Sequence, residues 1–221
     1  MTMHRVITIA TSTGARAEET GRLVAARLGL RYVNEQVVEW AAQQAGVPRE
    51  AVDHVEHAPP LLERVLQTLA VTEVFYGAPA DPSLVDPSPR YRALIQEVIT
   101  RTALAGGCVI VAHGAGVLLA GMSGVLRVFV TASPAVRAER VMAERGCSAR
   151  EATRAVEWTD HERAAYLQRF YGVSREPPTQ YDLVVNTDRL TAQDAARIIV
   201  SAARVSEPEY AGRVSSGHPQ V

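Results

Sequence analysis

The stretch from Val6 to Gly29 constrains the fold more than any other part of the chain. Residues 6–10 are apolar or β-branched, which is typical of a buried strand. A loop that contains glycine follows, and apolar residues then recur at helical spacing as far as Leu28. A strand that leads through such a loop into a helix directs backbone N–H groups and the positive end of the helix dipole toward one point. The pattern therefore predicts a phosphate-binding loop.

The loop carries only part of a nucleotide-binding motif. Gly14 is followed by Ala15, Arg16, Ala17 and Glu18, whereas the motif GxxxxGK[ST] uses its lysine to contact phosphate and its hydroxyl to bind magnesium. All 23 basic residues of the chain are arginine, so it contains no lysine. Any cation that contacts phosphate here must therefore be an arginine or a metal ion.

Composition limits the classes of function. The 221 residues are enough for one α/β domain with insertions, and a net charge of −1 argues against general binding to nucleic acid or to a membrane surface. Cys108 and Cys147 are too few and too far apart for a disulfide framework. The chain shows no signal peptide, no apolar run long enough to cross a bilayer and no metal-ligand cluster. We expect a cytoplasmic protein.

Short apolar runs alternate with helical patterns through the rest of the chain. Further strands are predicted at 30–33, 108–112, 126–131 and 182–186, and helices at 34–46, 133–146, from Ser148 onward and at 191–204. This alternation predicts a mostly parallel sheet that is covered by helices on both faces. Ligands bind such sheets beyond the carboxyl ends of the strands. The candidate site therefore consists of the loops that follow the strands: residues 11–18, Asn34, residues 113–116, Ser133 onward and Thr187 onward.

Residues 137–169 are rich in arginine. Arg137 and Arg140 lie three residues apart and share a helix face, as do Asp160 and Arg163, and Arg169 follows nearly two turns later. For any single one of these arginines, an exposed charged helix is the better interpretation. As a set they suit phosphate binding, because guanidinium groups bind phosphate through two parallel hydrogen bonds.

The order and spacing of several segments resemble the cytidylate kinase-like branch of the nucleoside monophosphate kinases. The segments are residues 7–29, YVNEQVVEWAAQQAGV, CVIVAHGAGVLL, LRVFVTASPAVRAERV, DHERAAYLQRFYG and YDLVVNT. The resemblance implies a three-layer α/β core in residues 1–205, with a monophosphate-binding insertion at about 34–105 and a lid at about 148–178. Residues 206–221 are expected to form a disordered tail.

The resemblance also implies roles for particular residues. Gly14 to Glu18 would wrap the donor phosphates of ATP, with Mg²⁺ as the second cofactor. Arg137, Arg163 and Arg169 would contact phosphate in the closed state, and Asp160 would orient Arg163. The γ-phosphoryl group would then pass to a nucleoside monophosphate, a pyrimidine nucleotide being the expected acceptor.

Some positions differ from the family pattern. Asn34 stands near the acceptor site in place of an aspartate, and His113 stands in place of an arginine. Arg16 and Ala17 replace glycines, and each would cost roughly 1–2 kcal/mol if it adopted a left-handed backbone conformation. The alternative interpretations are a catalytically weakened scaffold that senses nucleotides or binds a partner, and a protein that shares only the fold.

Overall fold

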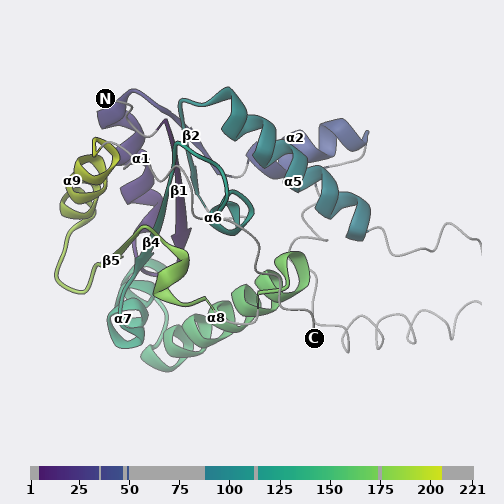
Figure 1. Ribbon diagram of the computed structural model, residues 1–221. Coiled ribbons are helices and arrows are strands. Elements are labelled where there is room, and N and C mark those ends of the chain that lie inside the picture. The colour runs from purple at the N-terminus through teal and green to yellow at the C-terminus, as the bar shows by residue number, and fades with distance from the viewer. Residues whose placement is uncertain are drawn as a thin grey trace, which may run out of the picture.

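The computed structural model describes residues 5–34, 36–46, 49, 88–111, 114–173 and 176–205, with side chains from residue 92 onward in the fourth of these ranges. The described residues form a five-stranded sheet in the order β2-β3-β1-β4-β5, with helices on both faces (Figure 1). Every strand pairing in this sheet is parallel. The predicted α/β fold with a parallel sheet is confirmed.

The strands agree with the prediction to within one residue at either end. They are β1 Val6–Thr11, β2 Arg31–Val33, β3 Cys108–Val111, β4 Val125–Thr131 and β5 Leu183–Asn186. The helices are α1 Ala17–Leu28, α2 Gln36–Ala45, α5 Ser88–Ala105, α6 Ala115–Leu118, α7 Pro134–Arg145, α8 Ala149–Tyr171 and α9 Ala192–Ala203, with a short 3₁₀ turn, η2, at Pro178–Gln180. Residues 115 and 116 of the loop predicted at 113–116 belong to the short helix α6.

Two hydrophobic cores hold the layers together, one on each face of the sheet. The first lies between the sheet and the pair α1 and α9, and it contains Ile7, Ile9, Val128 and Ile199. The second joins the other face to α2, α5 and α6 through residues such as Val37, Ile95, Ile99, Ile110 and Leu119. Apolar residues therefore occupy both sides of the strands, as expected when helices cover both faces of a parallel sheet.

Local sequence sets the helix ends near the candidate site. Pro134 occupies the first turn of α7, which ends at Gly146 in the left-handed conformation. Ser148 and Glu151 form a capping box, so α8 starts after Ser148, as predicted, and continues as one helix of 23 residues through most of the predicted lid. Figure 1 shows α7 and α8 beyond the carboxyl ends of the strands, where ligands bind in this class of fold.

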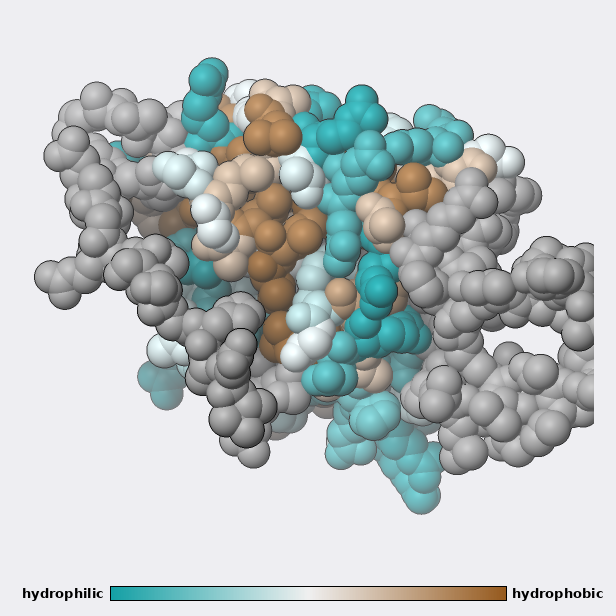
Figure 2. Space-filling model, turned by 45° about the vertical axis from the view of Figure 1, so that its right-hand side comes forward, coloured by the Kyte–Doolittle hydropathy of each residue, from teal (hydrophilic) through white to brown (hydrophobic). Residues whose placement is uncertain are grey.

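The surface of the described residues is mixed in polarity. On the face in Figure 2, apolar residues gather in a central band with hydrophilic residues beside it. No helix in the described ranges combines the length and the apolar character needed to cross a bilayer. The predicted tail at 206–221 and residues 50–87 of the predicted insertion lie outside the described residues, so both assignments stay predictions.

Candidate phosphate-binding site

The phosphate loop, residues Ser12 to Arg16, connects β1 to α1. It begins with a turn in which the Ala15 N–H donates to the Ser12 carbonyl at 2.9 Å. Gly14 has φ +80°, and a Cβ atom at this position would lie only 2.7 Å from the backbone oxygen of Arg137. Glycine is therefore required twice, for the backbone conformation and for the close approach of the loop to α7.

Three successive carbonyl groups of the phosphate loop accept hydrogen bonds from side chains behind it. Arg137 Nη1 donates to Thr13 O at 3.4 Å, Arg140 Nη1 to Gly14 O at 3.1 Å, and Thr187 Oγ1 to Ala15 O at 3.1 Å. In a trans peptide the C=O and the following N–H point in opposite directions. The N–H of Gly14 therefore points away from Arg137, and the N–H of Arg16 points away from Thr187. Two N–H groups that are free of the bonds behind the loop are what an anion-binding loop needs.

Arg16 marks the junction between the phosphate loop and α1. It has φ 63° and ψ 24°, which is left-handed, and its side chain does not cap the helix. The residue after it, Ala17, is helical, so the strain predicted for both residues falls on Arg16 alone. The first-turn N–H groups of α1 have no intrahelical partner, and they add a partial positive charge at this point.

A cleft of about 750 Å³ opens beside the phosphate loop, and we call it the loop cleft. Its charged lining residues are Arg16, Arg22, Arg140, Arg145, Glu18, Glu19 and Glu144. Arg22 pairs with Glu18 at 3.2 Å, which offsets the charge of that carboxylate. Burial lowers the pKa of Arg140, and the positive charge of the neighbouring Arg16 lowers that pKa further. Two guanidinium groups that repel one another thus share the loop cleft, and an anion between them would relieve this repulsion.

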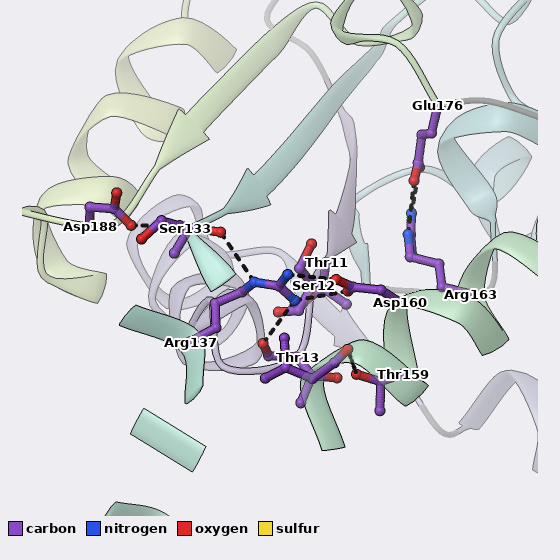
Figure 3. A network of polar contacts seen from close by, with 12 residues as sticks. Thr11, Ser12, Thr13, Ser133, Arg137, Thr159, Asp160, Arg163, Glu176 and Asp188 are labelled. Atoms are coloured by element: carbon purple, nitrogen blue, oxygen red, sulfur yellow. Dashed lines mark hydrogen bonds and ion pairs between the residues drawn. The ribbon is translucent and has the colours of Figure 1, made fainter. Parts of the chain in front are cut away.

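Arg137 connects the phosphate loop to α8. It is only 4% exposed, and its guanidinium donates to Asp160 at 2.8 and 2.6 Å and to the Ala132 carbonyl at 3.1 Å (Figure 3). The Asp160 carboxylate thus orients Arg137, whereas Arg163, which it was expected to orient, pairs with Glu176, so that expected role stays a prediction. The reason is geometric: both side chains leave α8, but Asp160 points toward the phosphate loop.

Arg163 points away from Asp160, toward Glu176 (Figure 3). Its Nε and Nη2 donate to the Glu176 carboxylate at 2.9 and 2.5 Å, and Tyr181 donates its hydroxyl proton to the same carboxylate. A hollow of about 200 Å³, the α8 hollow, lies beside this pair, and its lining includes Ser12, Phe129 and Asp160. Asp160 and Arg163 of α8 thus pair with residues from different parts of the chain, Arg137 and Glu176.

Comparison with known proteins identifies the family. No match was found among the curated proteins. The sequence profile of the cytidylate kinase-like family matches residues 6–189. The chain belongs to this family.

Solved structures of similar shape agree with the fold. An uncharacterized protein from Eubacterium ventriosum is 12% identical with a TM-score of 0.63, and the alignment covers 90% of this chain and 97% of that one. Shikimate kinase from Bacteroides thetaiotaomicron is 13% identical with a TM-score of 0.50, and the alignment covers 90% and 98% of the two chains. At these identities the likeness establishes the fold alone, which is that of a phosphate-loop kinase.

Two other predicted site residues of this cytidylate kinase-like protein, Asn34 and Arg169, lie apart from the loop cleft. Asn34 follows β2 at one edge of the sheet, where its carbonyl accepts from Val37 N–H at 3.1 Å. Arg169 lies in the last turn of α8 with its guanidinium 5.0 Å from the ring of Phe170. Neither lines the loop cleft or the α8 hollow. His113 lies outside the described residues, so its predicted role stays untested.

Sequence reasoning assigned no individual role to four residues that the structure places at the site of this cytidylate kinase-like protein: Arg140, Glu176, Tyr181 and Thr187. Arg140 carried a signal, because it shares a helix face with Arg137, and so did Thr187, because it directly follows a predicted strand. Glu176 and Tyr181 carried none, since nothing in their spacing connects them to Arg163. Among the described residues, no group of three or more His, Cys, Asp or Glu is placed to hold a metal ion without further ligands.

Proposed function

We propose that this protein transfers the γ-phosphoryl group of ATP to a nucleoside monophosphate, and that the acceptor is a pyrimidine nucleotide. Membership of the cytidylate kinase-like family supports the reaction class. The observation that carries the proposal is the phosphate loop itself, whose Thr13 and Ala15 carbonyls bond Arg137 and Thr187 so that the N–H groups of Gly14 and Arg16 face the other way.

The residues of the loop cleft fit a polyphosphate. The first-turn N–H groups of α1 and the guanidinium groups of Arg16 and Arg140 would hold phosphate oxygens. ATP supplies the phosphoryl group, and Mg²⁺ neutralises phosphate oxygens when it is bound. Magnesium prefers oxygen ligands and takes one or two carboxylates together with phosphates, so Glu19 is the residue proposed to hold it.

Arg137 and Asp160 act in this proposal from behind the phosphate loop. Arg137 is buried and bonds two backbone carbonyls, so it supports the shape of the loop. Asp160 holds the Arg137 guanidinium in place. Phosphoryl transfer depends chiefly on positioning and on electrostatic stabilisation, so a fixed loop with converging N–H groups and cations contributes directly to the rate.

A nucleotide-binding scaffold without catalysis is the second candidate function. The observation that favours it is that Arg137 and Arg163, both expected to contact phosphate, are instead paired with carboxylates. In this alternative the loop cleft would bind an anion weakly, and no phosphoryl group would be transferred.

ADP formation from ATP and Mg²⁺ with a panel of CMP, dCMP, UMP and AMP tests the proposal. We expect turnover with at least one pyrimidine monophosphate. Arg140→Ala should lower kcat/KM by about 100-fold or more, the scale seen when a charge-stabilising donor is removed from an active site. Arg154→Ala, at an exposed position of α8, is the matched control and should not change kcat/KM.

Calorimetry separates the two candidates. The kinase proposal requires binding of both ATP and CMP, each titrated alone, whereas the scaffold requires at most one of them. Absence of turnover with every acceptor, combined with absence of ATP binding, would contradict the kinase proposal.

A further inference from the structure

Arg163 is held by groups that do not belong to the phosphate loop. The Glu176 carboxylate accepts two of its hydrogen bonds, and Tyr181 donates to that same carboxylate. The ring of Tyr181 stacks on Phe129 with the centroids 5.1 Å apart. The Arg163 guanidinium carbon lies 5.8 Å from the centroid of Phe129. Arg163 is thus held at one edge by a carboxylate and lies over an aromatic face.

The pair is largely buried, which makes its orientation specific. The side chains of Arg163 and Glu176 are 19% and 15% exposed. Removing two charges from water offsets most of their mutual attraction, so a buried ion pair contributes little net stability. The ion pair has a clearer effect on geometry. Glu176 accepts two hydrogen bonds from Arg163 and a third from Tyr181, so the guanidinium group has few possible orientations.

Arg163 lies where a fixed guanidinium could contact a second substrate. Arg163 and Glu176 line the α8 hollow, together with Ser12 and Asp160. The same two residues also line the space beside residues 114–117, at the start of α6. Arg163 therefore lines a hollow that reaches Ser12 of the phosphate loop and that Arg140, which lines the loop cleft, does not line. A second substrate in the α8 hollow would lie beside the donor.

We propose that Glu176, held by Tyr181, is a positioning residue that directs Arg163 toward the anionic group of the acceptor. This inference rests on the proposed phosphoryl transfer. Arg163 would bind a phosphate oxygen with the guanidinium edge that does not contact Glu176. Asp160 is the other carboxylate that lines the α8 hollow, and Arg137 already neutralises it. The recognised chemistry is a phosphate monoester on a small acceptor.

A competing role for Glu176 predicts the opposite result. If its carboxylate merely occupied Arg163 until an anion arrived, removal of the negative charge would strengthen acceptor binding. If it positions Arg163, removal of the charge weakens acceptor binding, since the guanidinium is no longer fixed. The direction of the change therefore decides between the two roles.

Glu176→Gln and Tyr181→Phe, which keeps the stacked ring, are compared with the wild type in steady-state kinetics with CMP and ATP. Glu176→Gln should raise the KM for CMP by roughly 10- to 100-fold, the factor for losing one charge-assisted hydrogen bond. Tyr181→Phe should raise it less, and the KM for ATP should stay unchanged in both variants. Glu157→Gln, at an exposed position of α8, is the matched control. A lower or unchanged KM for CMP in Glu176→Gln overturns the proposal.

Hydrogen exchange at the Nε–H of Arg163, followed by ¹⁵N NMR and assigned with Arg163→Ala, gives a readout that does not depend on activity. Protection in the wild type that is lost in Glu176→Gln supports the positioning role, and equal exchange in the two proteins overturns it. If the wild type shows this protection but no turnover with any acceptor, the positioning is supported and the proposed phosphoryl transfer fails. The same exchange measurement on Tyr181→Phe, in which Arg163 and Glu176 are both retained, tests the positioning role in a second variant. The result therefore does not depend on whether Glu176→Gln folds.

Discussion

Two arginine–carboxylate pairs, Arg137 with Asp160 and Arg163 with Glu176, each have one member in α8, and they differ in the groups that surround the arginine. On the loop side, Arg137 bonds Asp160 but also two backbone carbonyls, and Arg140 adds bonds to the backbone of Gly14 and Thr187. On the acceptor side, the contacts found for Arg163 join it to the side chains of Glu176 and Phe129. The first set fixes the main chain, and the second fixes one cation.

This difference separates two tasks that any phosphoryl transfer needs. A loop that presents N–H groups must keep one backbone shape, because each peptide group contributes by its direction. A cation that meets a second substrate needs only a defined side-chain orientation. We therefore expect changes on the loop side to lower stability strongly, and changes on the acceptor side to act mainly on acceptor binding.

Arg137→Ala should have the largest effect on stability. It leaves the carbonyls of Thr13 and Ala132 without their donor and Asp160 without its partner, and each carbonyl left unsatisfied costs about 1–3 kcal/mol. The free energy of unfolding, measured by urea denaturation followed by circular dichroism, gives this value. Asp160→Asn is the control and should lose much less, because the Asp160 side chain is 44% exposed. Equal losses in the two variants would show that the backbone bonds of Arg137 do not support the loop.

Arg16→Gly should separate the shape of the loop from its charge. Glycine adopts the left-handed conformation without strain, so this variant should be more stable than Arg16→Ala by about 1–2 kcal/mol. Both variants remove a cation that lines the loop cleft, so both should bind ATP more weakly than the wild type. Urea denaturation measures the first quantity and calorimetry with ATP the second. Unchanged ATP affinity in both variants would remove Arg16 from the proposed site.

The sequence was a good guide where short-range patterns determine structure. Apolar runs predicted each strand of the described residues to within one residue at either end, and the helix expected from Ser148 onward is α8. The stretch from Val6 to Gly29 also predicted a strand, a loop and a helix in succession, which the structure has as β1, residues 12–16 and α1.

The pairing of charged groups was not predictable in the same way. Asp160 and Arg163 are three residues apart and share a helix face, which suggested that they interact, yet each has a partner from another element. Helix spacing brings two side chains near one another, but longer-range partners compete for them. Glu176 lies 13 residues from Arg163, and only the path of the chain after α8 brings the two together.

The last prediction concerns pH and should have the smallest effect. On the loop side, Asp188 accepts the backbone N–H of Ser133 just before α7, and this hydrogen bond lowers the pKa of the carboxyl. At the start of α9, the hydroxyl of Thr191 and then Arg197 lower the pKa of Asp194 to about 2. A lowered folded-state pKa gives stability that is present above the unfolded value, near 3.8 for aspartate, and is lost as the pH falls through the folded value.

Thermal unfolding between about pH 7 and pH 2.5 should therefore show a smaller loss of Tm in Asp188→Asn and Asp194→Asn than in the wild type. Both variants should start from a lower Tm at neutral pH, where the carboxylates contribute. If acidification also weakens ATP binding in the wild type and in Asp194→Asn, but less in Asp188→Asn, then Asp188 helps to fix the site through the backbone of Ser133. Equal pH dependence of ATP binding in all three proteins would show that Asp188 stabilises α7 without affecting the ATP site. The backbone of the phosphate loop would then be supported by Arg137, Arg140 and Thr187.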